Sequence, residues 1–310
     1  MAITGKPQES QLPELILEDE ALRDGLQMES AILSLEEKLQ LFRLLKGAGV
    51  RRIQVGSFVH PKIVPQMADT DELIRTIGDP EGTVLTALVL NDKGLERALA
   101  TGIGHLSMSV SASDTHSRKN AGKPADEALD NMTELIRSAA ASGVRVRAGL
   151  QCSFGCVYEG TVEVEKVIRG LTRMAHAGAS EVNLADTAGM ANPHVVRDLV
   201  GRVRDEFPDI PVSLHLHDTR GLGLANMYAG YEAEVRIFDT AAGGLGGCPF
   251  VKGAAGNVPT EDAVNMFESM GVNTGVDLDI LIDAIGFLEN RLGRSLPGRM
   301  GRVLAGAEND

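Results

Sequence analysis

The chain has 310 residues, 43% of them hydrophobic, which is enough to bury a large core in a single domain. Its formal net charge of −13 argues against nucleic acid or an anionic membrane as a partner, because phosphate contacts need clustered Lys and Arg. Three cysteines make no disulfide framework, the first residues do not resemble a signal peptide, and no apolar run reaches the ~20 residues of a membrane helix. We therefore expect a soluble cytoplasmic protein.

Apolar, β-branched runs recur along the chain, with helical patterns between them. The runs that predict strands are Leu15–Glu18, Arg52–Val55, Thr83–Leu88, His105–Val110, Arg145–Leu150, Glu181–Leu184, Val212–His217 and Ile237–Thr240. Eight strand–helix units of this length predict an α/β fold of the closed (β/α)₈ type, a TIM barrel. A doubly wound open sheet is the alternative, but no Gly-x-Gly-x-x-Gly follows the first strand.

Helices are predicted where apolar residues recur at spacings of three and four. These segments are Leu35–Ala48, Asp126–Ser142, Glu163–Ala177 and Pro193–Glu206. Ser34 is the expected N-cap of the first of them, and Gly49, Gly143 and Gly178 stand where helices should end. The remainder from Asp262 also has a helical pattern. We expect one domain, with a barrel over about residues 14–260 and a helical C-terminal extension over about 261–310.

Polar residues follow the predicted strands at the end where barrel enzymes carry their chemistry. In chain order these residues are Arg23, Asp24, Gln54, Ser57, Ser109, Ser111, Asp114, Gln151, Asp186, Thr187, His215, His217 and Asp218. Because all strands of a parallel barrel point the same way, these side chains should converge on one rim.

His215 and His217 lie two residues apart on a predicted strand, so their imidazoles should point to the same face. Two imidazoles joined by a carboxylate make a seat for a divalent metal, with Asp24 as the first candidate and Asp218 as the weaker one. A pair of hydrogen-bonded core histidines is the alternative.

Two acidic clusters have both structural and functional interpretations. Asp24 can be a turn residue, or it can bind a metal while Arg23 offers donors to an enolate or carboxylate. Asp186 and Thr187 can line the pocket floor, although we favour structural support for them.

Cys248 lies in the run Gly243-Gly244-Leu245-Gly246-Gly247-Cys248-Pro249. A thiol among glycines can approach a bound substrate closely, or it can be a small hydrophobic residue covered by the loop. For Cys152 and Cys156 the packing interpretation is stronger. The glycines can also cradle phosphate, but no Lys-Ser/Thr follows them as in a nucleotide P-loop.

Seven stretches in order carry a resemblance to a known family. They are LRDGLQ (Leu22–Gln27), SFVHPKIVPQMAD (Ser57–Asp69), SASDTHSRKN (Ser111–Asn120), GCVYEG (Gly155–Gly160), ADTAGMANP (Ala185–Pro193), LHLHDTRGLGLAN (Leu214–Asn226) and GGLGGCPFVKGAAGN (Gly243–Asn257). From about Leu15 to Gly271, the chain resembles the 3-hydroxy-3-methylglutaryl-CoA (HMG-CoA) lyase family, part of a TIM-barrel metallolyase group. The cysteine loop and the SFV-x-PK-x-VPQM stretch are specific to the lyase branch.

The resemblance implies a role for particular residues. Asp24, His215, His217 and Asn257 would bind Mg²⁺ or Mn²⁺, and the catalytic residues would be Arg23, Asp24, His215 and Cys248. Gln27, Gln54, Ser57, Asn120 and Tyr158 would contact the acyl-CoA substrate. The resemblance also implies a homodimer.

The implied reaction is a retro-Claisen cleavage to acetyl-CoA and acetoacetate. The metal would hold the 3-hydroxyl and an acyl oxygen, and His215 or a metal-held water would take the hydroxyl proton. Arg23 would stabilise the thioester enolate, and Cys248 would protonate its carbon from a closing loop.

The chain departs from the family pattern at two positions. Gln54 stands where the family has a Glu, and Ser30 where it has a Lys, so two charges are lost. Gln54 leaves open a related substrate, such as citramalyl-CoA or a longer 3-hydroxyglutaryl-CoA. The four cations Lys62, Arg118, Lys119 and Lys123 lie in rim loops, where they either meet the CoA phosphates or form a solvated surface.

Three other functions fit the same residues less well. An Fe(II) oxygenase also uses two His and one carboxylate, but its His-x-Asp spacing is absent. A Claisen-type synthase would use the same enolate chemistry, usually with an additional C-terminal domain. A non-catalytic acyl-CoA binder is the third, because of Gln54.

Overall fold

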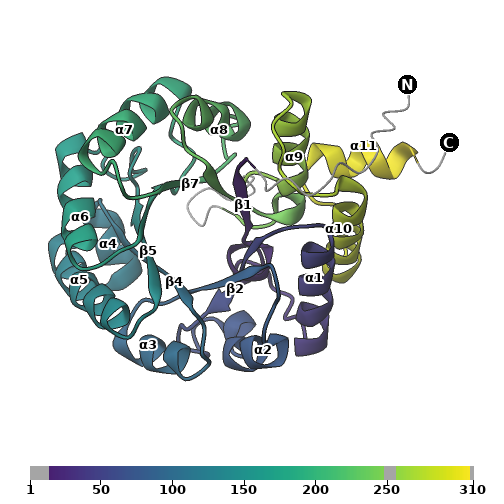
Figure 1. Ribbon diagram of the computed structural model, residues 1–310, viewed down its shortest axis with the longest axis horizontal. Coiled ribbons are helices and arrows are strands. Elements are labelled where there is room, and N and C mark those ends of the chain that lie inside the picture. Colours follow the sequence, from purple (N-terminus) through teal and green to yellow (C-terminus); the bar gives the residue numbers. More distant parts are fainter. Residues whose placement is uncertain (1–13, 248–255, 308–310) are drawn as a thin grey trace.

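Eight parallel strands form a closed barrel at the centre of the molecule (Figure 1). The computed structural model describes residues 14–247 and 256–307. The strands are β1 (Ile16–Asp19), β2 (Arg52–Ser57), β3 (Val84–Leu88), β4 (His105–Ser111), β5 (Arg145–Gln151), β6 (Glu181–Asp186), β7 (Val212–Leu216) and β8 (Ile237–Thr240). Each strand pairs with its neighbour along the chain, and β8 closes the ring by pairing with β1. The predicted TIM barrel is confirmed.

Helices surround the barrel as an outer ring (Figure 1). They are α1 (Leu35–Gly47), α2 (Thr70–Ile77), α3 (Asp92–Leu99), α4 (Asp114–Ala121), α5 (Ala125–Ala141), α6 (Val164–His176), α7 (Pro193–Glu206), α8 (Gly223–Glu232) and α9 (Thr260–Ser269). Two more, α10 (Leu278–Leu292) and α11 (Arg299–Ala307), follow α9, and α10 packs against α1 and α9. Short turns are η1 (Ala21–Gly25), η2 (Pro65–Met67) and η3 (Ala242–Gly244).

The ends of the predicted helices have the expected local chemistry. Ser34 caps α1 in a capping box, in which its hydroxyl accepts from the Glu37 backbone and the Glu37 carboxylate accepts from the Ser34 backbone. Gly49, Gly143 and Gly178 all have positive φ, as a residue that leaves a helix for the next strand often requires.

Two details differ from the expectation. The ladder of β7 ends at Leu216, and His217 instead forms an isolated bridge with Asn257. Helix α4 is a second helix between β4 and β5 that was not predicted. The Ser113 side chain caps its N-terminus, and Gly122 ends it in a left-handed conformation. The bridge matters for the site, since it draws Asn257 to the end of β7.

The hydrophobic core lies mainly between the barrel and its helices, and it continues to α10 through Leu281 and Leu288. Within the described residues, no helix is both long and apolar enough to cross a membrane. The inside of the barrel is different from this core, because charged side chains fill it.

Candidate active site

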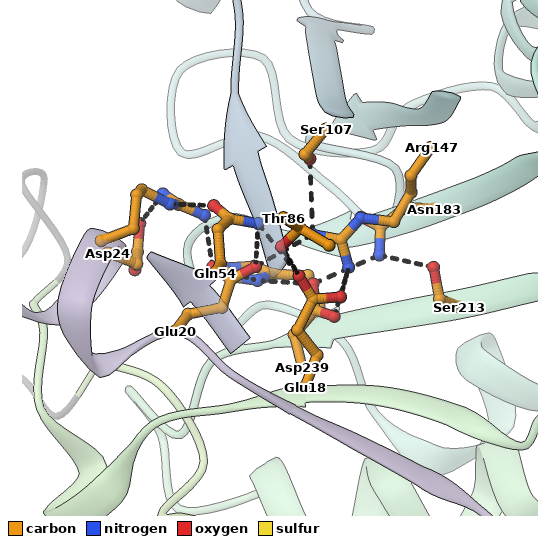
Figure 2. A network of polar contacts seen from close by, with 12 residues as sticks. Glu18, Glu20, Asp24, Gln54, Thr86, Ser107, Arg147, Asn183, Ser213 and Asp239 are labelled. Carbon is orange, nitrogen blue, oxygen red and sulfur yellow. Dashed lines mark hydrogen bonds and ion pairs between the residues drawn. The ribbon is translucent and has the colours of Figure 1, made fainter. Parts of the chain in front are cut away.

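A layer of buried charged side chains fills the inside of the barrel (Figure 2). Arg147 of β5 lies at its centre and forms ion pairs with Glu18 (2.9 Å), Glu20 (3.0 Å) and Asp239 (2.5 Å). All four side chains are at most 3% exposed. Arg52 also pairs with Glu18, and Arg23 with Glu20, so every carboxylate of the layer has at least one guanidinium partner.

Above this layer, Asp24, His215 and His217 offer ligand atoms that all lie within 4.8 Å of one another. His215 and His217 come from the end of β7, and Asp24 comes from the turn η1 after β1. The two Nε2 atoms are 3.0 Å apart, and the Nδ1 atom of His215 faces Asp239 Oδ2 at 3.2 Å. A carboxylate behind an imidazole fixes the ring and supports positive charge on it. The three predicted metal ligands are thus brought together.

The two histidines have opposite pKa shifts. Burial works against a charge on His215, but the Asp239 hydrogen bond and the charges of Glu20, Asp239 and Asp24 outweigh it and raise its pKa to about 9. Burial and the neighbouring charge of His215 lower the pKa of His217 to about 4. With the protein groups alone, a protonated His215 therefore donates its Nε2 proton to a neutral His217.

That shared proton lies where a cation bound by both rings would lie. Asp24 supplies the carboxylate; burial opposes its charge, but Arg23 and the two histidines lower its pKa to about 2, so it is ionised. Asn257 donates from Nδ2 to Asp24 Oδ2 at 2.9 Å, and its buried Oδ1 has no partner among the described residues. Two imidazoles, a carboxylate and an unused amide oxygen fit a divalent metal that prefers oxygen and nitrogen ligands.

Arg23 lies beside this group, and hydrogen bonds hold its guanidinium on three sides. Its partners are the carboxylates of Glu20 and Asp24 and the side-chain oxygen of Gln54. Gln54 in turn donates to Glu20 Oε1 at 2.9 Å and is fully buried. The amide accepts a hydrogen bond from Arg23 and donates one to Glu20, whereas a carboxylate could only accept. Gln54 therefore acts on the site through Arg23 and Glu20.

A cavity of about 1030 Å³ opens over these groups. Arg23, Asp24, His215 and His217 line it, so the charged groups face its interior. Its size falls in the range of small-molecule sites. Part of the predicted polar rim therefore surrounds the cavity, including Ser109, Ser111, Gln151 and Thr187. Within the described residues, its lining does not include Gln54, Ser57, Asp114, Asp186 or Asp218.

The predicted substrate contacts lie at different depths. Gln27 and Asn120 line the cavity, and Gln27 Oε1 is buried without a partner among the described residues. Ser57 is completely buried behind the wall, and Tyr158 is 42% exposed, with Lys119 4.6 Å from the centre of its ring. Neither of these two belongs to the cavity lining in the described part of the chain. Direct contacts from Ser57 and Tyr158 therefore stay predictions.

The four predicted CoA-binding cations differ in their distance from the cavity and in their ion pairs. Lys123 lines the cavity and pairs with Glu127 at 3.0 Å, on the surface of the molecule. Arg118 pairs with Asp114 at 2.7 Å, which uses part of its charge. Lys123 is thus the best placed of the four to meet an anionic ligand.

Several other candidates have structural roles. Asp218 accepts from the Gly223 backbone at 2.7 Å and is outside the metal cluster, as expected of the weaker candidate. Asp186 accepts from the Met190 and Ala191 backbone groups, so it orders the loop after β6. Cys152 is buried, and burial raises the pKa of its thiol to about 12.

Cys248 lies outside the described residues, but the chain on either side of it is defined. Gly247 lines the cavity, and Gly246 has a φ of +117° that favours glycine. A Cβ atom on Gly246 would approach Asn257 Nδ2 to 2.7 Å, and one on Gly256 would approach the Gly246 backbone to 2.6 Å. The two ends of this segment therefore lie side by side next to Asp24, His215, His217 and Asn257, which together form the predicted metal-ligand group.

Sequence reasoning missed the charged layer below the metal ligands. Glu18, Glu20, Arg147 and Asp239 were not predicted, although each interrupts or follows an apolar strand run. A charged residue at an inward position of a barrel strand is the signal that would have indicated them.

Comparison with known proteins gives one family. The HMGL-like family model matches residues 14–287. The hydroxymethylglutaryl-CoA lyase of Bacillus subtilis is 40% identical over 89% of this chain and 93% of its own length. The crystal structure of the B. subtilis HMG-CoA lyase superposes with a TM-score of 0.91 over 94% of this chain and 98% of that one.

Two further relatives carry information about ligands. The (R)-citramalyl-CoA lyase of Chloroflexus aurantiacus is 39% identical over 92% of this chain and 93% of its own. An HMG-CoA lyase of Acinetobacter baumannii, solved with coenzyme A and 3-methylmalate, is 36% identical with a TM-score of 0.87, over 93% of this chain and 94% of that one. By its barrel, its family-model match and these relatives, the chain belongs to the HMG-CoA lyase family of carbon–carbon lyases.

Proposed function

We propose that this protein is a divalent-metal-dependent lyase that cleaves 3-hydroxy-3-methylglutaryl-CoA to acetyl-CoA and acetoacetate. The observation that carries the proposal is the convergence of Asp24, His215 and His217 beside Arg23 at the floor of a cavity. The membership of the chain in the HMG-CoA lyase family gives this convergence its chemical meaning.

Asp24, His215, His217 and Asn257 Oδ1 would hold Mg²⁺ or Mn²⁺. When bound, the metal would polarise the substrate oxygens and lower the cost of an alkoxide at the 3-position. His215 would accept the hydroxyl proton on Nε2 only when that atom is released from the metal, and Asp239, which binds its Nδ1 atom from behind, would then stabilise the charged ring.

Arg23 is suited to the negative charge that develops on the thioester oxygen. Its guanidinium faces the cavity and is held by Glu20, Asp24 and Gln54, so it is oriented before the substrate arrives. A preorganised cation stabilises an enolate without the cost of reorienting solvent.

We assign the last proton transfer, to the enolate carbon, to Cys248. Gly247, the residue before Cys248 in the chain, lines the cavity. Cys248→Ser should lower turnover at least about tenfold, because a serine hydroxyl is a much weaker acid. The matched control is Cys156→Ser, which changes a buried thiol that is hydrogen-bonded to Ser113. This variant should turn over substrate at the wild-type rate.

An acyl-CoA panel tests the function directly. Purified protein, first stripped by chelator and then supplied with Mn²⁺ or Mg²⁺, is incubated with HMG-CoA, citramalyl-CoA and a longer 3-hydroxyglutaryl-CoA, and products are identified by mass spectrometry. We expect acetyl-CoA and acetoacetate from HMG-CoA, only with metal. Full activity of the stripped protein would exclude the metal role, and no acetyl-CoA from any thioester would exclude the lyase.

Citramalyl-CoA is the second candidate substrate. The C. aurantiacus relative, named for that activity, is nearly as similar as the B. subtilis lyase, and Gln54 departs from the family residue. Cleavage of citramalyl-CoA with a higher kcat/KM than HMG-CoA in the same panel would establish it.

We also propose that the protein is a cytoplasmic homodimer. The free thiols of Cys152 and Cys156 are compatible with a reducing compartment, and the dimer follows the family resemblance. Light scattering of the purified protein at micromolar concentration measures the mass of the assembly, for which we expect twice that of the chain.

A further inference from the structure

A second cavity opens at the opposite end of the barrel, where the strands begin. Its volume is about 1000 Å³, nearly that of the active-site cavity. Ile16 of β1, His105 of β4 and Ile237 of β8 stand on its wall at the first positions of their strands. Among the described residues, the two cavities share no lining residue, so they are separate spaces.

Four arginines and one carboxylate, Glu181, make up the charged part of this wall, so its net charge is basic. Arg51, Arg75 and Arg145 line the cavity, and none of them forms an ion pair or side-chain hydrogen bond with any residue in 14–247 or 256–307. Arg52, by contrast, is held by Glu181 at 2.7 Å and Glu18 at 2.5 Å. We call Arg51, Arg75 and Arg145 the basic wall.

A basic wall is unexpected in a chain with 43 acidic and 30 basic residues. Like charges gathered at one cavity repel one another, so they add nothing to stability without an anion between them. Guanidinium groups bind carboxylate and phosphate through two parallel hydrogen bonds, which makes arginine the usual residue for such anions.

A buried polar group on the same wall also lacks a partner. His105 is 5% exposed, and its buried Nε2 makes no hydrogen bond to the described residues. Burial, with the charges of Arg52, Arg147 and Arg145, lowers its pKa to about 2, so the ring is neutral. A buried imidazole without a partner is costly, and a ligand in the cavity is a source of the missing contact.

The rest of the wall is apolar. Ile74, Val84 and Ile103 contribute to it, and Val84 is 46% exposed although it lies in a strand. We propose that this cavity binds a small amphipathic anion, with its carboxylate or phosphate on the basic wall and its hydrocarbon body along these apolar side chains.

The first experiment measures binding of four probes of similar size by calorimetry. The probes are octanoate, octyl phosphate, octanol and octylamine. We expect at least about tenfold tighter binding of one or both anions than of octanol, and no detectable binding of octylamine. The anion that binds more tightly identifies the head group. Equal binding of octanol and both anions would overturn the proposal.

Substitutions of the basic wall separate this cavity from other sites. Arg75→Gln and Arg145→Gln should each weaken anion binding at least about fivefold. Arg169→Gln removes the same charge from an exposed position of α6 outside both cavities and should leave binding unchanged. Wild-type affinity in both wall variants would overturn the proposal.

Two further readouts place the ligand. In spectra of protein with labelled histidines, the anion should shift the His105 ring resonances and leave those of exposed His194 unchanged. Saturating coenzyme A should not displace the anion. A shift at His217 instead of His105, or displacement by coenzyme A, would assign the binding to the active-site cavity and overturn the inference.

Discussion

The mouth of the barrel and the buried layer below it hold charged groups in opposite ways. At the end where the strands terminate, Asp24, His215 and His217 converge on one point and face an open cavity. In the layer below these residues, Arg52 lies between Glu18 and Glu181, and Arg147 binds three carboxylates, so protein partners neutralise the charges of what we call the paired layer.

This difference distinguishes groups that can bind a ligand from groups that stabilise the structure around them. A buried charge surrounded by partners stabilises a geometry but has no spare atoms for a ligand, whereas converging groups with unshared atoms attract one. Asp239 joins the two regions, because one of its oxygens accepts from Arg147 and the other from His215. The paired layer therefore orients His215 through Asp239.

The largest effect is expected from removing the central cation of the paired layer. Arg147→Met leaves Glu18, Glu20 and Asp239 without their shared partner and should lower the free energy of unfolding by about 3–5 kcal/mol, measured by urea denaturation. Arg137→Met removes an exposed ion pair with Glu134 and should leave the free energy of unfolding nearly unchanged.

If Arg147→Met does not fold, the combination with Glu18→Gln and Asp239→Asn still tests the idea. Removing two of the uncompensated charges should recover folded protein. A single variant as stable as the wild type would show that the paired layer is not a support.

The next largest effect should come from Asp239, which connects the layer to the metal-ligand group. Asp239→Asn removes the charge behind His215 and should lower Mn²⁺ affinity or turnover about 10–100-fold, because groups behind a ligating histidine typically contribute that much. Calorimetric titration with Mn²⁺ and steady-state rates measure the two quantities.

Asp209→Asn makes the same chemical change at an exposed position and serves as the control. Unfolding curves of both variants separate a loss of orientation from a loss of fold. If Asp239→Asn left both the Mn²⁺ affinity and the rate unchanged, the paired layer would have no influence on the metal-ligand group.

The next prediction concerns Glu261, a buried carboxylate without a cationic partner, and tests whether an ion pair is needed to keep a buried carboxylate ionised. Glu261 is fully buried; its Oε2 accepts from the Gly243 backbone, and its Oε1 has no partner among the described residues. Burial, together with the charges of Asp262 and Asp19, raises its pKa from 4.5 to about 8. The folded protein thus keeps a proton there that the unfolded chain loses.

The sign follows from this difference. Below pH 4.5 both states are protonated and the full stability is present; between 4.5 and 8 only the folded state holds the proton, so stability falls as pH rises. The decrease is at most about 1.4 kcal/mol per pH unit for one group. Glu261→Gln should flatten the urea-unfolding free energy between pH 5 and 8, and exposed Glu206→Gln should not. An equally steep decrease in both variants would assign it elsewhere, for example to Asp19.

Much of the fold and part of the site could be predicted from local patterns. The strand runs, the N-cap at Ser34 and the glycines at helix ends depend on neighbouring residues, so they can be predicted without tertiary information. The spacing of His215 and His217 likewise predicts one shared face, since strand side chains alternate. Asp24 could be joined to them because parallel strand ends meet at one rim.

The paired layer could not be predicted in the same way. Arg147 and Glu18 are 129 positions apart, and their contact depends on how the barrel closes. The bridge between His217 and Asn257 likewise depends on the path of the chain after β8. The cavity at the opposite end required the closed barrel, because its wall combines residues from all eight strands or the loops that precede them.

The smallest expected effect concerns Gln54, at the boundary between the two regions. Gln54→Glu keeps an acceptor for Arg23 but replaces the donor to Glu20 with a carboxylate, so Arg23 should shift toward the added charge. We expect a change of up to about tenfold in the ratio of kcat/KM for HMG-CoA and citramalyl-CoA, because substrates that differ by one methylene are separated by only about 1–3 kcal/mol. Gln66→Glu, an amide-to-acid change outside the cavity lining, controls for charge alone. Equal ratios in all three proteins would mean that Gln54 orders Arg23 without selecting the substrate, and selectivity would then belong to the residues that line the cavity.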